Sequence, residues 1–355
     1  MKRIRSFRNF VIFFQVFIIQ NSFCFTKNFS VENIILDRFK CLPSNGDVSF
    51  ELESQLMDYE NIYMTLLASW LAHETLPEYR LKQLRNWGFY KHFDLLKDGY
   101  GHRGYVAIHN DFVLLAFRGT ESIKDYISNA LFFQTDFSKE MKKSNSFIHK
   151  GMADTFLELK KQTLKIMTLP EIKKKPIVLA GHSLGGVMAT LFAVKLFNEG
   201  YDVRHIYTAG MPKIGNQGVQ KHINGLIGEK LLSVSLSTDL TPMVPPQRES
   251  ATIFSKIITK YLSFFRFILR KTVEGTNYEI NPGQLFVLRN NAENNLMTIE
   301  KEISFKEREY RYFKEISRKL QYSTDSNELL KFIKSRFQSH HPDNYICGLS
   351  KILSQ

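Results

Sequence analysis

The central part of the chain alternates short apolar runs with longer stretches in which apolar residues recur at helical spacing. The apolar runs have the length of buried strands and cover 104–109, 112–117, 175–180, 203–207 and 231–237. The helical stretches cover 51–74, 150–169 and 184–198. Strands that alternate with helices predict a mainly parallel central sheet flanked by helices, which is an α/β fold.

The strand predicted at 175–180 leads directly into the sequence Gly181-His-Ser-Leu-Gly-Gly186. In a Gly-x-Ser-x-Gly pattern the serine occupies a tight turn between a strand and a helix. A side chain at either flanking position would collide with the neighbouring backbone. We therefore predict a nucleophile elbow in which Gly181 and Gly185 shape the turn and Ser183 is the candidate nucleophile.

A serine hydroxyl is a poor nucleophile at neutral pH, so it needs a histidine to take its proton and an acidic group to orient that histidine. The chain order expected for this fold is serine, acid, histidine. Asp239 lies just past the strand predicted at 231–237, where an α/β sheet presents ligand-facing residues; the alternative is a turn aspartate that ends the strand. His340 and His341, in a short polar loop near the C-terminus, are the candidate bases, whereas His222 has no such context.

Five motifs occur in order along the chain: Phe117-Arg-Gly-Thr120, Ile148-His-Lys-Gly151, Gly181-His-Ser-Leu-Gly-Gly186, Thr208-Ala-Gly-Met-Pro-Lys-Ile-Gly-Asn216 and Ser237-Thr-Asp-Leu-Thr-Pro-Met-Val-Pro-Pro246. Together they resemble the class 3 lipases, the fungal-lipase-like group of the α/β-hydrolase superfamily. The resemblance runs from about residue 55 to 246 and resumes near 340. It implies an α/β-hydrolase fold, with no metal and no organic cofactor.

The resemblance also assigns roles to individual positions. The family's nucleophile maps to Ser183 and its acid to Asp239. Its histidine maps best to His340, because family members often show a tyrosine five positions later, here Tyr345. His341 is the close alternative base.

An oxyanion hole and a lid are further implications of the resemblance. The backbone N–H groups of Thr120 and Leu184 would stabilise the developing oxyanion, although Thr120 has an alternative role as a turn residue after the strand. The segment 121–133, followed by 134–146, occupies the place of the family's lid. Its apolar side chains could line an acyl channel or pack against the sheet.

Two segments stand out as insertions. Residues 251–272 are rich in aromatic and basic residues, and 253–271 has the pattern of a basic amphipathic helix that either lies in a lipid interface or packs on the hydrolase core. Residues 291–338 are highly charged and helical in pattern. They account for the roughly one hundred residues between Asp239 and His340, a separation larger than is usual in the family.

Composition narrows the choice of partners. The chain has 355 residues, of which 43% are hydrophobic and 23% charged, so we expect one substantial core and a single domain over 25–355. The net charge of +13 favours anionic surfaces, but no zinc-finger spacing or RNA-binding aromatic signature points to nucleic acid. The resemblance implies a lipid substrate, and the positive charge is consistent with a membrane or lipid interface. We expect no nucleic acid partner and leave the oligomeric state open.

The N-terminus has the pattern of a targeting segment. Four positive charges in residues 1–8 precede an apolar run at 10–20 that is too short to span a bilayer comfortably. We expect a signal peptide at 1–24 and a secreted or envelope-associated protein; an uncleaved anchor is the alternative. Cys41 and Cys347 would remain after cleavage, either paired in an oxidising compartment or as two unrelated buried thiols.

These observations predict a serine ester hydrolase, either a lipase or a phospholipase, that cleaves acyl esters of lipids through an acyl-enzyme intermediate. One alternative is a lipase-like binding or regulatory protein without turnover. Another is a lipid acyltransferase, in which an alcohol takes the place of water as the acyl acceptor.

Overall fold

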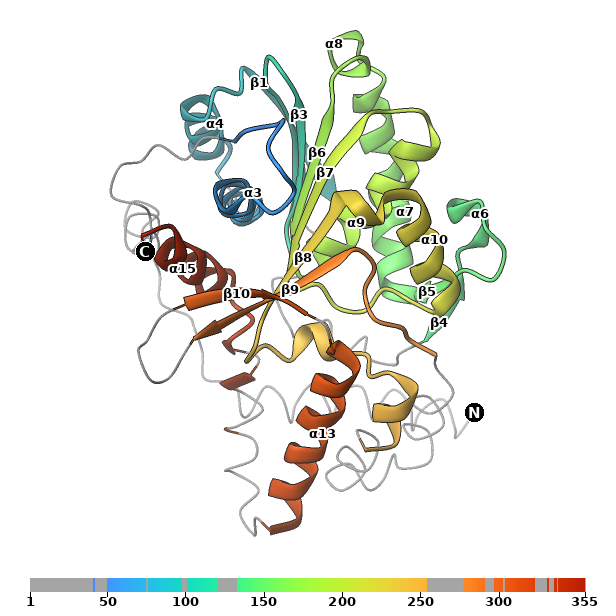
Figure 1. Ribbon diagram of the computed structural model, residues 1–355. Helices are drawn as coiled ribbons and strands as arrows, with labels where there is room; N and C mark the ends of the chain where they lie inside the picture. The colour runs from blue at the N-terminus through green and yellow to red at the C-terminus, as the bar shows by residue number, and fades with distance from the viewer. Residues whose placement is uncertain are drawn as a thin grey trace, which may run out of the picture.

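The computed structural model describes residues 41, 50–74, 76–97, 101–119, 133–253, 277–290, 297–302, 304–322, 331, 335–336 and 338–354. Over these residues the chain forms an eight-stranded sheet with helices on both faces (Figure 1). In spatial order the strands are β1 (Lys91–Lys97), β2 (Gly101–Ile108), β3 (Val113–Phe117), β6 (Ile177–His182), β7 (Val203–Ala209), β8 (Leu231–Leu236), β9 (Gln284–Asn290) and β10 (Met297–Lys301).

The strands pair in parallel at the centre of the sheet and antiparallel at its edges. The block from β3 to β9 is parallel throughout, whereas β1, β2 and β10 pair antiparallel with their neighbours. Every residue of β3, β6 and β8 is buried, as strands covered on both faces must be. The mainly parallel sheet flanked by helices that the sequence predicts is confirmed.

Two groups of helices cover the sheet (Figure 1). On one side lie α3 (Tyr59–Leu71), α4 (Pro77–Asn86) and α15 (Pro342–Leu353), and on the other α7 (Lys150–Met167), α9 (Leu184–Asn198) and α10 (Gln217–Ile227). The long helix α13 (Phe305–Tyr322) points away from the sheet. The shorter elements are β4 (Gln134–Asp136), α6 (Ser138–Met141), β5 (Phe147–His149), α8 (Pro170–Lys173), η1 (Gly228–Lys230) and η2 (Thr241–Met243). Each face of the sheet packs its own apolar core.

Helix boundaries follow local capping signals. α9 spans the stretch predicted at 184–198, and α7 ends two residues before the predicted limit of 169. The helix predicted at 51–74 is shorter in the structure, because it begins only after Asp58. The Asp58 side chain accepts a hydrogen bond from the Asn61 N–H and so acts as the N-cap of α3.

The charged segment 291–338 is only partly helical, which corrects the sequence analysis. It contains the strand β10 before α13, and this strand pairs with β9 at the edge of the sheet. Met297 is its only buried residue, and the charges of Glu300 and Lys301 stay exposed. An edge strand of this kind has no apolar run, so neither β10 nor the outer strand β1 is predicted from the hydrophobic pattern.

Several expected segments lie outside the described residues. They are the signal peptide at 1–24, the lid at 121–133 except for Phe133, and the basic amphipathic stretch 253–271 except for Ile253. Within the part of the chain that the structure covers, none of the helices combines the length and the apolar character needed to cross a bilayer.

Cys41 and Cys347 form a disulfide bond, with their Cα atoms 4.9 Å apart. Of the two alternatives for these cysteines, the structure therefore shows the paired one. The Tyr63 hydroxyl of α3 donates a hydrogen bond to the Cys41 carbonyl at 3.0 Å. Because the bond joins residues 306 positions apart, it restricts the unfolded chain strongly and ties α15 to the beginning of the domain.

A buried histidine at the end of β5 caps α7. His149 Nδ1 accepts a hydrogen bond from the Gly151 N–H at 3.1 Å. Burial lowers the pKa of His149 from 6.5 to about 4, against the opposing charge of Asp154. The ring is therefore neutral at pH 7, as an accepting Nδ1 requires.

Replacing His149 with asparagine keeps an acceptor for the Gly151 N–H but removes the titrating ring. The unfolded chain protonates this residue near pH 6.5, whereas the folded protein does so only near pH 4. Stability from the neutral ring is thus present at pH 7 and is lost, by roughly 3 kcal/mol, as the pH falls through this window. Urea unfolding at pH 7 and pH 4 should show a loss of stability that is smaller by about this amount in His149→Asn than in wild type. Equal losses would contradict the assignment.

Candidate active site

The turn between β6 and α9 holds Ser183 in a strained backbone conformation. Its φ of 58° and ψ of −128° lie in a region that residues other than glycine rarely occupy. The Ser183 N–H donates a hydrogen bond to the Ala209 carbonyl on β7 at 2.9 Å, and the Gly186 N–H donates to the Ser183 carbonyl at 2.9 Å. The turn is therefore fixed from both sides, with Ser183 at the carboxyl end of β6.

Two glycines allow the backbone to approach itself closely at this turn. A Cβ atom at Gly181 would lie 2.1 Å from the Gly185 carbonyl oxygen. A Cβ atom at Gly185 would lie 2.2 Å from the Phe117 carbonyl oxygen on β3. Because both contacts are with backbone atoms, neither position has room for a side chain.

The structure brings Asp239 and His340 together. His340 Nδ1 lies 2.7 Å from Asp239 Oδ2, and both residues are buried. The carboxylate accepts two further hydrogen bonds, from the Tyr345 hydroxyl to Oδ2 at 2.6 Å and from the Thr241 N–H to Oδ1 at 2.8 Å. Three donors compensate for the cost of burying this carboxylate.

Tyr345 links the acid to the strand before it. Its hydroxyl accepts a hydrogen bond from the Leu236 N–H at 3.2 Å while it donates to Asp239. Burial, together with the charge of Asp239, raises the pKa of Tyr345 well above its usual value of 10, so the phenol keeps its proton. From the sequence, Tyr345 only helps to choose between His340 and His341, and its contact with Asp239 is not predicted. The spacing of Tyr345 from His340 is the sequence signal that marks Tyr345 as part of the site.

The ring of His340 lies beside the Ser183 turn. A Cβ atom at Gly210 would be 2.8 Å from His340 Cε1, and Gly210 directly follows Ala209, whose carbonyl accepts the hydrogen bond from Ser183. The rings of His340 and His182 have centroids 4.6 Å apart. Nε2 of His340 is buried and has no hydrogen-bond partner among the residues that the structure describes.

His182 fixes the backbone of the histidine loop. Its Nε2 donates a hydrogen bond to the His340 carbonyl at 2.9 Å. Burial, and then the neighbouring His340, lower the pKa of His182 well below 6.5, so its ring is neutral at pH 7. The sequence analysis does not single out His182, although its place between Gly181 and Ser183 put it next to the turn.

His341 points to a different environment. Its Nδ1 accepts a hydrogen bond from the Asp343 N–H, so it caps α15, and its side chain is half exposed. The structure therefore brings His340, and not His341, to Asp239. The ring of His222 on α10 bonds the Met141 carbonyl at 2.8 Å, which fits the structural role expected for it.

The predicted oxyanion donors are only partly covered by the structure, because Thr120 lies outside the described residues. Leu184 is the first residue of α9 and directly follows Ser183. Gly119 lies against the turn, since a Cβ atom there would be 2.9 Å from Ser183 Cβ. The Gly119 N–H donates a hydrogen bond to His73 Nε2 at 3.3 Å, which ties the chain before Thr120 to the end of α3.

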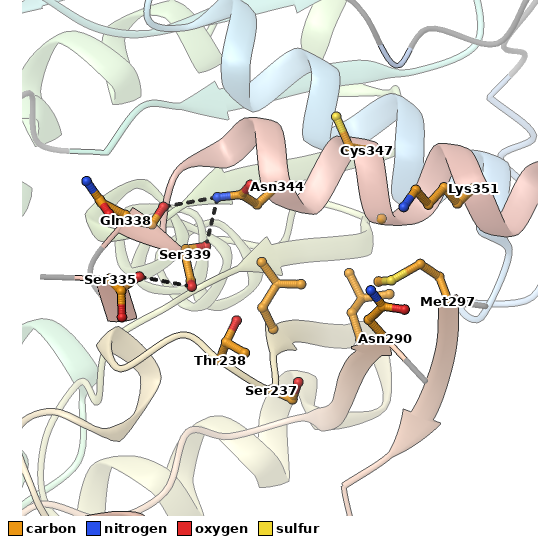
Figure 2. A pocket seen from close by; sticks show the side chains of 13 residues that line it. Ser237, Thr238, Asn290, Met297, Ser335, Gln338, Ser339, Asn344, Cys347 and Lys351 are labelled. Atoms are coloured by element: carbon orange, nitrogen blue, oxygen red, sulfur yellow. Dashed lines mark hydrogen bonds between the residues drawn. The ribbon is translucent and has the colours of Figure 1, made fainter. Parts of the chain in front are cut away.

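A hollow of about 420 Å³ lies next to this site (Figure 2). The residues just before Asp239 and just before His340 line it, together with one side of α15. Asn344 Nδ2 donates hydrogen bonds to the carbonyls of Gln338 and Ser339, at 3.0 and 3.4 Å, and so holds the loop before His340 on α15. None of the three candidate catalytic side chains lines the hollow. Over the described part of the chain, no group of three or more His, Cys, Asp or Glu side chains could hold a metal ion.

The sequence from β3 to the loop after β8 matches a family of known proteins. A family model described as lipase (class 3) matches residues 114–249, which include Ser183 and Asp239. Over these residues the chain is therefore similar to the class 3 lipases. The lipase of Rhizomucor miehei is 27% identical over 143 residues, which are 38% of each chain. The secreted mono- and diacylglycerol lipase A of Penicillium cyclopium is 28% identical over 124 residues, 34% of this chain and 40% of the relative.

The match therefore spans about two fifths of the length of these curated lipases. Among solved structures, a propeptide complex of the Rhizomucor miehei lipase aligns with 72% of this chain and 75% of that chain, with a TM-score of 0.50 and 18% identity. The α/β-hydrolase fold predicted from the sequence is confirmed.

Replacing Tyr345 with phenylalanine removes one donor from the buried Asp239 carboxylate. Hydrogen bonds to charged groups contribute about 1.5–3 kcal/mol, so we expect a loss of stability of this order in urea unfolding. We also expect kcat for a p-nitrophenyl ester to fall about tenfold, because the acid is held less firmly. Tyr310→Phe, at an exposed position on α13, is the matched control. Wild-type stability and kcat in Tyr345→Phe would show that the contact has no role.

Proposed function

We propose that this protein is a serine ester hydrolase that cleaves acyl esters of lipids through an acyl-enzyme intermediate. The observation that carries the proposal is the buried Asp239–His340 pair, with the unpartnered Nε2 of His340 beside the strained Ser183 turn. An imidazole oriented by a carboxylate on one nitrogen and left available on the other is suited to general base catalysis.

In the proposed reaction, Ser183 Oγ attacks the ester carbonyl carbon while His340 Nε2 takes its proton. The same nitrogen then gives the proton to the leaving alcohol, and the acyl group remains on Ser183. Water attacks the acyl-enzyme in the second half, again with His340 as the base, and the fatty acid leaves. Asp239 keeps the proton on His340 Nδ1 and stabilises the imidazolium that forms in both halves.

The start of α9 supports the oxyanion. The first N–H groups of a helix have no partner within the helix, and they form the positive end of its dipole. Leu184 supplies such an N–H directly after the nucleophile, and we propose Thr120 as the second donor. Donors fixed before the reaction stabilise the charge that develops on the carbonyl oxygen without having to reorganise.

The names of the relatives and the net charge of the chain support the proposed substrate class. The two curated relatives are named as a lipase and as a mono- and diacylglycerol lipase, which favours acylglycerol esters here. The net charge of +13 favours an anionic lipid surface as the place of action. We propose the segment 121–133 as the lid and 25–355 as one hydrolase domain.

We also propose that the protein is secreted or envelope-associated. The basic and then apolar N-terminal pattern at 1–24 supports a signal peptide. The disulfide between Cys41 and Cys347 fits an oxidising compartment. The Penicillium cyclopium relative is named as a secreted lipase.

Replacing Ser183 with alanine tests the proposal. Loss of the nucleophile should lower kcat for p-nitrophenyl esters, and for triacylglycerol emulsions and phospholipid vesicles where the wild type cleaves them, by about 10⁴- to 10⁶-fold. The control is Ser69→Ala, which removes a buried hydroxyl of α3 that only bonds the Thr65 carbonyl. Turnover in Ser183→Ala equal to that of wild type would rule out the proposed nucleophile. A wild type without measurable turnover on any of these esters would instead favour a lipase-like binding protein.

A further inference from the structure

The helix α13 packs on the loop that carries the proposed acid. It lies outside the segment 114–249 that matches the family and points away from the sheet (Figure 1). The apolar side of this amphipathic helix is not exposed to solvent. It forms a separate apolar core with the residues that follow Asp239. This core consists of Leu240, Met243 and Val244 with Phe305, Tyr312, Phe313 and Ile316.

A buried ion pair joins α13 to that loop. Lys213 Nζ lies 2.6 Å from Glu309 Oε2, and both side chains are completely buried. Lys213 Nζ also donates hydrogen bonds to the carbonyls of Met243 and Pro245, at 2.7 and 2.8 Å. Glu309 Oε1 accepts one from the Gln247 N–H at 2.7 Å. Three backbone groups of the segment 243–247 are therefore attached to one pair of opposite charges.

The pair depends on both partners. Burial lowers the pKa of Lys213, and the charge of Glu309 is the main effect that opposes it. An ammonium group without a counter-ion at this depth would be strongly unfavourable. Glu309, which comes from α13, is therefore what allows Lys213 to hold the loop as a cation.

The attached segment determines where Asp239 lies. Asp239 is four residues before Met243, and its Oδ1 already accepts from the Thr241 N–H at 2.8 Å. The Lys213 N–H adds a further bond, to the Val244 carbonyl at 3.2 Å. Movement of 243–247 would thus be transmitted along a short, hydrogen-bonded stretch of chain to the carboxylate.

A second residue of α13 contacts the strand before the acid. Arg308 Nη2 donates a hydrogen bond to Ser235 Oγ on β8 at 3.1 Å, and its Nε lies 2.7 Å from Glu302 Oε2. Burial lowers the pKa of Arg308, while the charges of Glu302 and, at longer range, Asp239 oppose this shift. The charges of the Arg308 guanidinium and of Asp239 therefore interact. Residues of α13 contact the chain both before Asp239, at Ser235, and after it, at 243–247.

We propose that α13 positions the acid of the catalytic site: Glu309, acting through Lys213, holds the segment 243–247 and thereby keeps Asp239 against His340. Lys213 and Glu309 are positioning residues, since neither touches the reacting atoms. The inference rests on the proposed function, because it assigns the charged helix a role in that same site.

The decisive variant replaces both charges at once. Glu309→Gln alone would leave the Lys213 ammonium buried without a counter-ion, and its loss of stability would obscure the result. In Lys213→Met/Glu309→Leu both charges are removed at similar volume, an exchange that other buried ion pairs tolerate. The matched control is Lys160→Met/Glu140→Leu, which removes a part-buried pair of 2.7 Å between α7 and α6. Circular dichroism and urea unfolding establish that each variant is folded.

We expect three changes in the double variant and none in the control. The kcat for a p-nitrophenyl ester falls about 10- to 100-fold with little change in KM, because a misplaced catalytic group affects the chemical step. The acid limb of kcat/KM moves to lower pH, since a loosened carboxylate stabilises the His340 imidazolium less. In NMR spectra we expect a downfield proton resonance from the His340 Nδ1–H in wild type and in Ser183→Ala, and we expect the double variant to lose it.

A wild-type kcat, pH profile and Nδ1–H resonance in the folded double variant would overturn the positioning role. If the wild type has no turnover, the proposed function fails, and the resonance alone decides: its loss in the double variant supports the positioning role and its retention overturns it. If the double variant does not fold, Glu309→Asp takes its place, because it keeps both charges and shortens the link by one methylene. The same readouts then apply, with smaller expected changes.

Discussion

The strained turn at Ser183 is the constraint on which the rest of the structure depends. A residue other than glycine with a positive φ costs on the order of 1–3 kcal/mol, so the surrounding structure must hold it in place. Here the Phe117 carbonyl of β3 lies against Gly185, and the Ala209 carbonyl of β7 accepts the Ser183 N–H. Both neighbours of β6 must run parallel to it and end at the same level for these contacts to form. The shape of the turn at Ser183 therefore depends on the parallel pairing of β6 with β3 and β7.

The other candidate catalytic groups reach this turn from distant parts of the chain. Asp239 comes from the loop after β8, and His340 lies 101 residues later, just before α15. Contacts that fix the position of His340 relative to Asp239 are therefore needed. α15 supplies them, because it carries Tyr345, which bonds the acid, and Cys347, which is tied to Cys41 by the disulfide. The geometry of the histidine is thus set by the packing of α15 on the sheet and on α3.

The elements that surround the motifs could be predicted from the sequence. The turn at Ser183 and the helix at 184–198 lie where the sequence pattern puts them, and the strand predicted at 175–180 is shifted by two residues, to Ile177–His182, because each has a local signal. The choice of His340 over His341 depends on Tyr345, whose spacing is visible even though its bond to Asp239 is not. A contact between distant residues can be predicted from sequence spacing only where both residues belong to recognisable motifs.

What could not be predicted has a physical reason in each case. β10 is an edge strand with one buried residue, so it has no apolar run that would indicate a strand. Its charged residues resemble those of the surrounding segment, which is helical in pattern. The pairing of Lys213 with Glu309 joins residues 96 positions apart, and nothing in the sequence near either residue indicates a buried partner. The predicted helix begins later than its apolar stripe indicates, because Asp58 caps α3 at its N-terminus.

In the proposed mechanism one hydroxyl, that of Ser183, is activated by the imidazole of His340. The most direct measurement is the reaction of the folded protein with a fluorophosphonate, followed by mass spectrometric mapping of the modified peptide. We expect a single adduct on Ser183, formed rapidly in wild type and at least about a thousandfold more slowly when His340 is replaced by alanine. An adduct on another residue of the active protein, or equal rates with and without the imidazole, would contradict it.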